Sequence, residues 1–229
     1  MNFRRGRGRH TQTNRNRGKE HSGVTENVTD DKFVAMTRDQ RTATAELLGS
    51  LSEMEWTRPT LCDGWTVEHL AAHLSMPFRI GLPRLLMAMI SARGDFDSAA
   101  DRLARRDIER MTRAQLVEVL HANVSTKWKV PGGDLADSFC HDVIHGLDLT
   151  EGLGRPHTAT PEQLLTTLNV IKTKNRMEHF GVDLRGHTAV ASDMDFRIGK
   201  GPEITLPAGR LVLLLTGRES VDQHLKRAE

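Results

Sequence analysis

The chain has 229 residues, enough for one large domain or two small ones with a core that needs no disulfides. No apolar run approaches the roughly 18–20 residues of a membrane-spanning helix, so a membrane partner is not expected. Tyrosine is absent and aromatic residues make up 4%, which argues against recognition of single-stranded nucleic acid by stacking. The only cysteines, Cys62 and Cys140, imply no disulfide framework and favour a reducing, cytoplasmic setting.

The N-terminal segment differs in charge from the rest of the chain. Residues 1–23 contain seven Lys or Arg and one acidic residue, a net charge of +6, which leaves −4 for the remainder of a chain whose total is +2. Such a stretch cannot bury enough apolar surface to offset its ordering entropy, so residues 1–32 are predicted to be a disordered basic tail. The tail is either a basic arm for nucleic acid or an inert extension, or the true start is Met36. We favour the inert readings, because the tail has no aromatic or Ser/Arg repeat.

The first predicted helices flank a short loop. Residues 33–51 have apolar positions at helical spacing, and Pro59 and Gly64 then break the helix. Thr66 is a good N-cap for a second helix with an inward face at i, i+3, i+4 and i+7. The residues of that face are Val67, Leu70, Ala71 and Leu74. His73 lies on the flank of the same face, which places an imidazole at the edge of a helix interface.

Helical patterns continue along most of the remaining chain. Further helices are predicted at 82–90, 113–124, 161–177 and 208–216, and the last of these, with Leu211 to Leu215, is expected to be buried. Between the last two, short alternating runs separated by Gly and Pro at 187–206 predict a small antiparallel sheet. Several helices joined by short loops favour a mainly α fold, an antiparallel bundle. We therefore expect a helical bundle at 33–178 and a small α/β C-terminal domain at 179–229.

One predicted helix carries the residues with most chemical potential. His141 and His145 are four residues apart, so their side chains leave the same face one turn apart and can reach one divalent metal. Asp148 lies on the same stripe and can hold a ligand histidine or bind a water. In a bundle, ligands project inward from facing helices, so His73 would complete a site with three histidines.

Three protein ligands leave a fourth position open, which is typical of a catalytic metal rather than a structural one. Zinc suits imidazole best on availability, although nickel, iron or copper would also bind. The competing interpretation is that these histidines only satisfy polar needs inside a bundle. Spacing alone does not decide between the two.

Three segments resemble the mycothiol-dependent maleylpyruvate isomerase family, whose fold is a DinB-like metal-binding four-helix bundle. The segments, which together span about Met36 to Leu225, are LCDGWTVxxLxxHL at 61–74, VIHGLDL at 143–149 followed by LGRP at 153–156, and LLLTGR at 213–218. The resemblance implies that His73, His141 and His145 are the metal ligands. The isomerase has a glutamate at the position of His141, so this chain departs from the family there and its site is one unit more positive.

The resemblance also implies an activity. The metal would activate a low-molecular-weight thiol, mycothiol or a similar cosubstrate, for attack on a small electrophile, in an isomerisation or a transfer. Arg218 could hold a substrate carboxylate with its planar fork, or serve only as a helix-terminal cation or surface ion pair. The alternatives to an enzyme are a metal-binding sensor or partner-binding protein of the same fold, and a nucleic-acid-associated protein acting through its basic tail.

Overall fold

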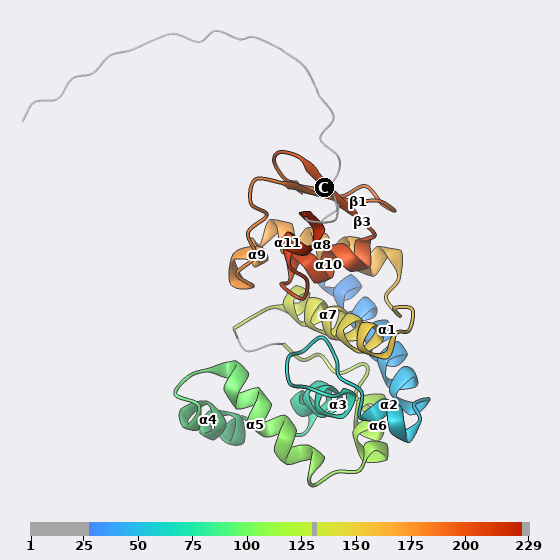
Figure 1. The fold of residues 1–229 in the computed structure, drawn as a ribbon. Coiled ribbons are helices and arrows are strands. Elements are labelled where there is room, and N and C mark those ends of the chain that lie inside the picture. The colour runs from blue at the N-terminus through green and yellow to red at the C-terminus, as the bar shows by residue number, and fades with distance from the viewer. Residues whose placement is uncertain (1–27, 130–131, 226–229) are drawn as a thin grey trace, which may run out of the picture.

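The computed structural model describes residues 28–129 and 132–225, so most of the predicted tail lies outside the described residues. The described chain is mainly helical, with a small sheet near its C-terminal end (Figure 1). Its helices are α1 (Asp30–Gly49), α2 (Glu53–Trp56), α3 (Val67–Ser75), η1 (Met76–Phe78), α4 (Leu82–Ser91), α5 (Phe96–Ile108), α6 (Arg113–Ala122), α7 (Leu135–Leu153), α8 (Pro161–Thr173), α9 (Arg176–His179), α10 (Ala208–Leu215) and α11 (Val221–Leu225). Its strands are β1 (Thr188–Ala191), β2 (Arg197–Gly199) and β3 (Glu203–Leu206).

Helices α1, α7, α3 and α6 form the predicted bundle. Each packs against the next in that order, and α6 closes the ring against α1. The N-cap of α1 is Thr29, which accepts a hydrogen bond from the backbone of Lys32 and extends the helix three residues before its predicted start. Caps of this kind satisfy backbone N–H groups that the first turn leaves without a partner.

Two hydrophobic cores meet along α1 and α7. One lies inside the bundle and includes Leu48 of α1 and Leu149 of α7. The other lies between the bundle and the C-terminal elements and includes Phe33 of α1 and Phe139 of α7, packed with α8, α10 and the sheet. Packing therefore continues across the predicted domain boundary at 178/179, which stays a prediction.

The C-terminal sheet has the strand order β2-β1-β3. Strand β1 pairs antiparallel with β2 but parallel with β3, so the expectation of an antiparallel sheet is wrong for the second pair. The chain reverses after β2, which turns β3 into the direction of β1, and β3 then joins the free edge of β1. The predicted buried helix follows as α10, whose residues from Leu211 to Leu215 are all fully buried.

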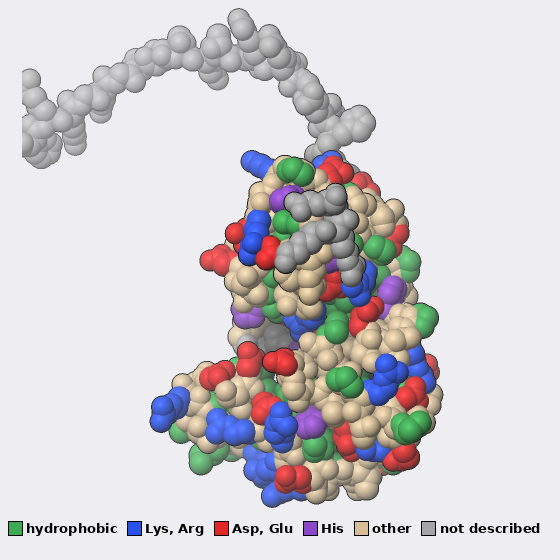
Figure 2. Space-filling view, in the orientation of Figure 1, with side chains coloured by type: hydrophobic (Ala, Val, Ile, Leu, Met, Phe, Trp, Pro, Cys, Tyr) green, Lys and Arg blue, Asp and Glu red, His purple; other side chains and the backbone are tan. Residues whose placement is uncertain are grey.

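Helices α4 and α5 extend from one side of the bundle (Figure 1). The apolar positions that mark α4 in the sequence are largely exposed, because α4 packs mainly against α5. Basic side chains gather over this part of the molecule (Figure 2). No helix among the described residues combines the length and the apolar character needed to cross a bilayer.

Candidate metal centre

Two helices of the bundle position the three histidines. His73 is on the last turn of α3 and is 6% exposed, and His141 and His145 lie one turn apart on α7. Helix α3 starts at a capping box with Thr66 as N-cap, the residue expected from the sequence. The cap sets where α3 begins, and the period of 3.6 residues then decides the direction in which His73 points.

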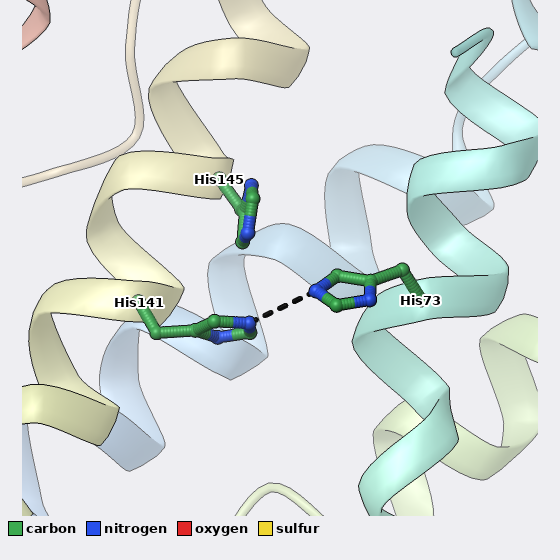
Figure 3. A group of neighbouring side chains, drawn as sticks. All are labelled: His73, His141 and His145. Carbon is green, nitrogen blue, oxygen red and sulfur yellow. Dashed lines mark hydrogen bonds between the residues drawn. The ribbon is translucent and has the colours of Figure 1, made fainter. Parts of the chain in front are cut away.

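The three imidazole rings converge on one small volume (Figure 3). Nε2 of His73 lies 3.1 Å from Nε2 of His141. The ring of His145 is 5.1 Å from that of His73 and 4.5 Å from that of His141, measured between centroids. One nitrogen of each ring lies within 4.8 Å of the others. The structure thus brings together the three residues that the sequence singled out.

The two histidines of α7 each bond a carboxylate through the nitrogen that faces away from the cluster. Nδ1 of His141 lies 2.9 Å from Oδ1 of Asp142, and Nδ1 of His145 lies 2.9 Å from Oδ2 of Asp148. Because a carboxylate only accepts, each Nδ1 carries a proton, and in the neutral form of such a ring the lone pair is on Nε2. This is the arrangement that orients histidine ligands in metal sites.

The donor set fits a divalent metal such as zinc. Two nitrogens bound to one tetrahedral zinc lie about 3.3 Å apart, close to the 3.1 Å between the Nε2 atoms of His73 and His141. Nδ1 of His73 is buried without a hydrogen-bond partner, so no neighbouring group of the described chain satisfies both nitrogens of this ring. In contrast, both ring nitrogens of a histidine on the surface would form hydrogen bonds with water.

Burial favours the uncharged form of two of the three histidines, His73 and His145. It lowers the pKa of His73 well below the ordinary value, and the neighbouring His145 and His141 lower it further. The pKa of His145 is also lowered, first by burial and then by His141. Neutral imidazole is the form that donates a lone pair to a metal, so the environment favours ligation at neutral pH.

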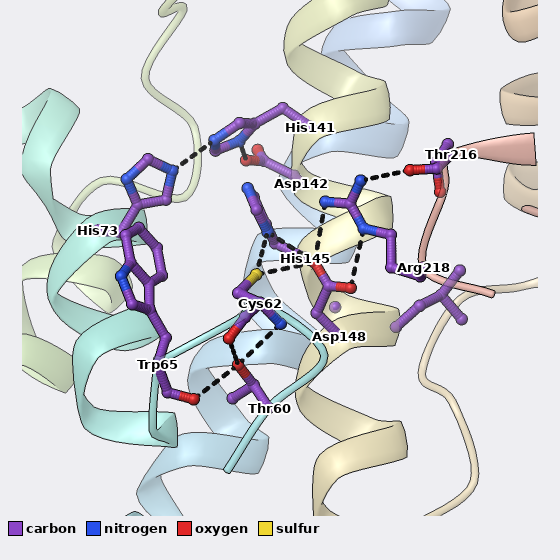
Figure 4. A network of polar contacts seen from close by, with 12 residues as sticks. Thr60, Cys62, Trp65, His73, His141, Asp142, His145, Asp148, Thr216 and Arg218 are labelled. Carbon is purple, nitrogen blue, oxygen red and sulfur yellow. Dashed lines mark hydrogen bonds and ion pairs between the residues drawn. The ribbon is translucent and has the colours of Figure 1, made fainter. Parts of the chain in front are cut away.

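A second polar cluster surrounds Asp148, whose side chain is 0% exposed (Figure 4). Its carboxylate accepts hydrogen bonds from His145, from the Cys62 thiol at 3.2 Å, and from two nitrogens of Arg218 at 3.1 and 3.2 Å. Burial alone would raise the pKa of Asp148, but His145 and Arg218 outweigh it and lower the pKa to about 2. Burial and the Asp148 carboxylate raise the pKa of Cys62, so Cys62 remains a protonated donor.

Cys62, His145 and Asp148 are also close enough to one another to bind an ion. We assign this group a supporting role instead, because Asp148 is already neutralised by Arg218 and the lone pair of His145 faces the other way. The predicted contact between Asp148 and a histidine of the cluster is present: Asp148 accepts a hydrogen bond from His145. The contact with Cys62 was not anticipated, since Cys62 and Asp148 are 86 positions apart.

Arg218 lies against Asp148 and does not face open solvent. Its Nε and one terminal nitrogen bond the Asp148 carboxylate, and its other terminal nitrogen donates to the carbonyl of Thr216. The guanidinium also lies 5.6 Å from the ring centroid of Phe180. One edge of the fork is therefore occupied within the protein, and the role of Arg218 as a substrate anchor stays a prediction.

Aromatic walls and a buried arginine complete the surroundings. Trp65 packs on His73 with ring centroids 5.1 Å apart, and Trp128 on His141 with centroids 5.6 Å apart. Arg41 of α1 bonds Asp142 at 2.6 Å. Sequence reasoning assigned no role at the site to Trp65, Trp128 or Arg41. No local pattern could have found Arg41, which is 101 positions from its partner.

Fold and site together define a class of protein: a helical bundle with three convergent histidines close enough to bind one metal ion. The comparisons agree with this class and make it more specific. Residues 37–126 match the family model of the mycothiol maleylpyruvate isomerase N-terminal domain. The family resemblance predicted from the sequence is thus confirmed over these residues. No relative was found among curated protein sequences.

Two solved structures share the fold. A histidine-to-alanine variant of the mycothiol-dependent maleylpyruvate isomerase is 15% identical, with a TM-score of 0.57. The mycothiol-dependent maleylpyruvate isomerase itself is 16% identical, with a TM-score of 0.51. Each comparison covers 84% of this chain and 90% of the other. At this level of identity the likeness confirms the predicted DinB-like bundle with its C-terminal appendage.

Proposed function

We propose that this protein is a metal-dependent enzyme that activates a low-molecular-weight thiol, of the mycothiol type, toward a small electrophile. The observation that carries the proposal is the convergence of His73, His141 and His145, two of which bond a carboxylate through Nδ1 and so direct Nε2 toward the shared space. These residues would hold the metal, and three protein ligands leave a position for a thiol. Zinc is the proposed ion, because imidazole ligands suit it and it is readily available.

A bound divalent cation would stabilise a thiolate over a thiol at neutral pH. The chain supplies a matching charge balance: Asp142 is paired with Arg41, Asp148 is paired with Arg218, and an imidazole that binds a metal brings no charge of its own. The cation's charge would therefore remain uncompensated, which favours an anionic sulfur as its further ligand. The rings of Trp65 and Trp128 keep water from two sides of the cluster.

The similarity to maleylpyruvate isomerases supports isomerisation as the reaction. A thiolate adds to one carbon of a conjugated alkene, which leaves a single bond free to rotate, and elimination of the sulfur restores the double bond and returns the thiol. We propose that Arg218 keeps Asp148 and His145 in place during this cycle and offers its remaining N–H groups to a substrate carboxylate.

Metal binding is tested by elemental analysis and zinc titration of the wild type beside His73→Ala and His145→Ala. Each substitution removes a ligand nitrogen, so we expect at least about a tenfold loss of affinity, no milder than the loss of a residue that only supports a ligand. His121→Ala is the control, because His121 is an exposed histidine of α6. Equal zinc affinity in all four proteins would refute the metal site.

Thiol activation is tested separately on the zinc-loaded protein. We expect the thiol to bind in calorimetry and to stimulate turnover of an electrophilic alkene, with both signals lost in His73→Ala. Protein that holds zinc but neither binds nor uses a thiol would instead be a metal-binding sensor or partner-binding protein of the same fold.

A further inference from the structure

Arg41 is a buried cation next to the candidate metal centre. Its side chain is 6% exposed and its partner Asp142 is 8% exposed. Nε of Arg41 donates to Oδ2 of Asp142 at 2.6 Å, and a terminal nitrogen donates to the carbonyl of Thr126 at 2.7 Å. The guanidinium lies 5.1 Å from the ring centroid of Phe78. Helix α1 thus reaches both α7 and the segment that follows α6.

A buried ion pair is a poor device for stability, because desolvation offsets much of the attraction and apolar replacements are often as stable. The position of this pair suggests a different use. The second oxygen of Asp142 accepts from Nδ1 of His141, so one carboxylate joins the arginine to the histidine. The carbonyl of Thr126 also accepts the backbone N–H of Trp128, whose ring packs on His141. Both groups that Arg41 bonds therefore connect it to His141: Asp142 bonds His141 directly, and the carbonyl of Thr126 bonds Trp128, which packs on His141.

The same order of groups occurs at the neighbouring histidine, where Arg218 bonds Asp148 and Asp148 bonds His145. The two arginines come from opposite ends of the described chain, yet each supports one histidine of α7 through a carboxylate. His73 has no such support, since its Nδ1 is unpartnered.

We propose that Arg41 is a positioning residue of the metal centre: it holds Asp142 so that His141 presents Nε2 to the cluster, and it holds the turn that places Trp128 against His141. The inference rests on the proposed function for its purpose, but the hydrogen-bond geometry stands without it.

The substitution Asp142→Asn gives a sharp test of this coupling. The N–H groups of Arg41 would force the amide oxygen of Asp142→Asn toward themselves, so the amide nitrogen would face His141. His141 would then have to accept on Nδ1 and carry its proton on Nε2, which blocks the lone pair. In the double variant Arg41→Met/Asp142→Asn this constraint is gone, and the amide can turn its oxygen back to His141.

The experiment uses the full chain, with ¹⁵N imidazole NMR of the metal-free protein and zinc affinity measured against a chromophoric chelator. We expect the Nδ1–H tautomer of His141 in the wild type, the Nε2–H tautomer in Asp142→Asn, and Nδ1–H again in the double variant. Zinc affinity should fall at least about tenfold in Asp142→Asn, less in Arg41→Met, and the double variant should match Arg41→Met. Arg38→Met, which breaks an exposed pair on the same helix, is the control and should change neither signal.

An unchanged tautomer in Asp142→Asn, or a double variant as weak as the two losses combined, would overturn the inference. If Asp142→Asn does not fold, Arg41→Lys decides: one ammonium cannot fill the place of two separated guanidinium nitrogens, so zinc affinity must still fall relative to Arg38→Lys. A wild type that binds no zinc would refute the proposed function, whereas the tautomers of the metal-free protein would still decide the role of Arg41.

Discussion

At the scale of single residues, Asp148 joins distant parts of the chain at one carboxylate. It accepts from His145 on its own helix, from Cys62 in the loop before α3, and from Arg218 after α10. Such a carboxylate stays ionised in the interior because both of its oxygens accept hydrogen bonds and its charge has a partner. The same contacts that orient His145 therefore also tie the C-terminal segment to the bundle.

Arg218→Met is expected to lower the free energy of unfolding by about 3–5 kcal/mol, because it leaves the fully buried Asp148 without its cation. Arg197→Met is the control: its pair with Glu203 is exposed on both sides, so its loss should cost less than about 1 kcal/mol. Urea unfolding of both variants measures the difference. Similar losses in the two proteins would show that Asp148 does not depend on Arg218.

The buried histidines predict a pH dependence of stability. His73 and His145 have lowered pKa values in the folded protein, whereas in the unfolded chain they titrate near 6.5. Below about pH 6.5 the unfolded chain therefore binds protons that the folded protein does not, and the free energy of unfolding of the metal-free protein should fall with pH. Two such groups give a slope of up to about 2.7 kcal/mol per pH unit.

Denaturant unfolding of the metal-free protein across this range measures the slope, which should drop by about half in His73→Ala. The pH range in which the histidines change the stability is separate from the range in which Asp148 does. Because the pKa of Asp148 is lowered, its ionised carboxylate stabilises the folded protein above pH 3.8. This stabilisation is lost only as the pH falls from 3.8 toward about 2. Stability that stays level between neutral pH and pH 4 would contradict the burial argument for the histidines.

At the scale of elements, α7 matters most because it carries two of the histidines, both carboxylates and part of each core. Its C-terminal turn approaches the loop before α3 closely: a Cβ on Gly152 would lie 2.8 Å from Cα of Thr60 and would also clash with the carbonyl of Pro59. The backbone N–H of Leu61 donates to the carbonyl of Asp148 at the same contact. Glycine therefore lets the loop that holds Cys62 lie against the helix.

Gly152→Ala is expected to destabilise the protein by about 1–3 kcal/mol, because rigid backbone on both sides cannot move away. Gly146→Ala is the matched control on the same helix. A Cβ there would lie 2.5 Å from Nε2 of Gln40, which is the end of a side chain and not backbone. Moving it would break its hydrogen bonds to Thr44 and Thr158, but alanine gains up to about 1 kcal/mol of helix propensity in return. Thermal unfolding should rank Gly152→Ala well below Gly146→Ala, and the reverse order would refute the close approach.

At the scale of the whole molecule, the candidate site lies where the two cores meet along α7. Residues from α1, the loop before α3, the segment after α6 and the end of α10 all contribute to its surroundings. The integrity of α1 therefore matters to the site, although α1 provides no ligand. Phe33 in its first turns packs against Phe139 of α7, with ring centroids 5.7 Å apart.

Two truncations separate the tail from the fold. Deletion of residues 1–35 removes Thr29 and Phe33, and we expect a loss of at least about 3 kcal/mol in the free energy of unfolding. Deletion of residues 1–27 leaves α1 whole and should leave stability and zinc affinity unchanged. Loss of zinc binding on the shorter deletion would contradict the site as drawn. Nucleic-acid binding that disappears with the shorter deletion would instead support the basic-arm interpretation of the tail.

The sequence by itself determined the local features of this protein. Helix positions, the Thr66 cap, the burial of α10 and the shared face of His141 and His145 follow from periodicity and capping, which act over a few residues. The hydrogen bond between Asp148 and His145 follows from the same spacing. The motif at 61–74 also carried the family resemblance, because it holds a loop, a cap and a candidate ligand in one segment.

Only the tertiary structure decided which distant groups meet. No local sequence pattern predicts the contact of Arg41 with Asp142 or that of Cys62 with Asp148. The same is true of the parallel pairing of β3 with β1 and of the exposure of the apolar residues of α4. A helical or alternating pattern of apolar residues predicts which face of a helix or strand is apolar, but it does not predict which element packs against that face. The partner is selected by how the whole chain closes its cores, and the charge and hydrogen bonding of the candidate site follow from that selection.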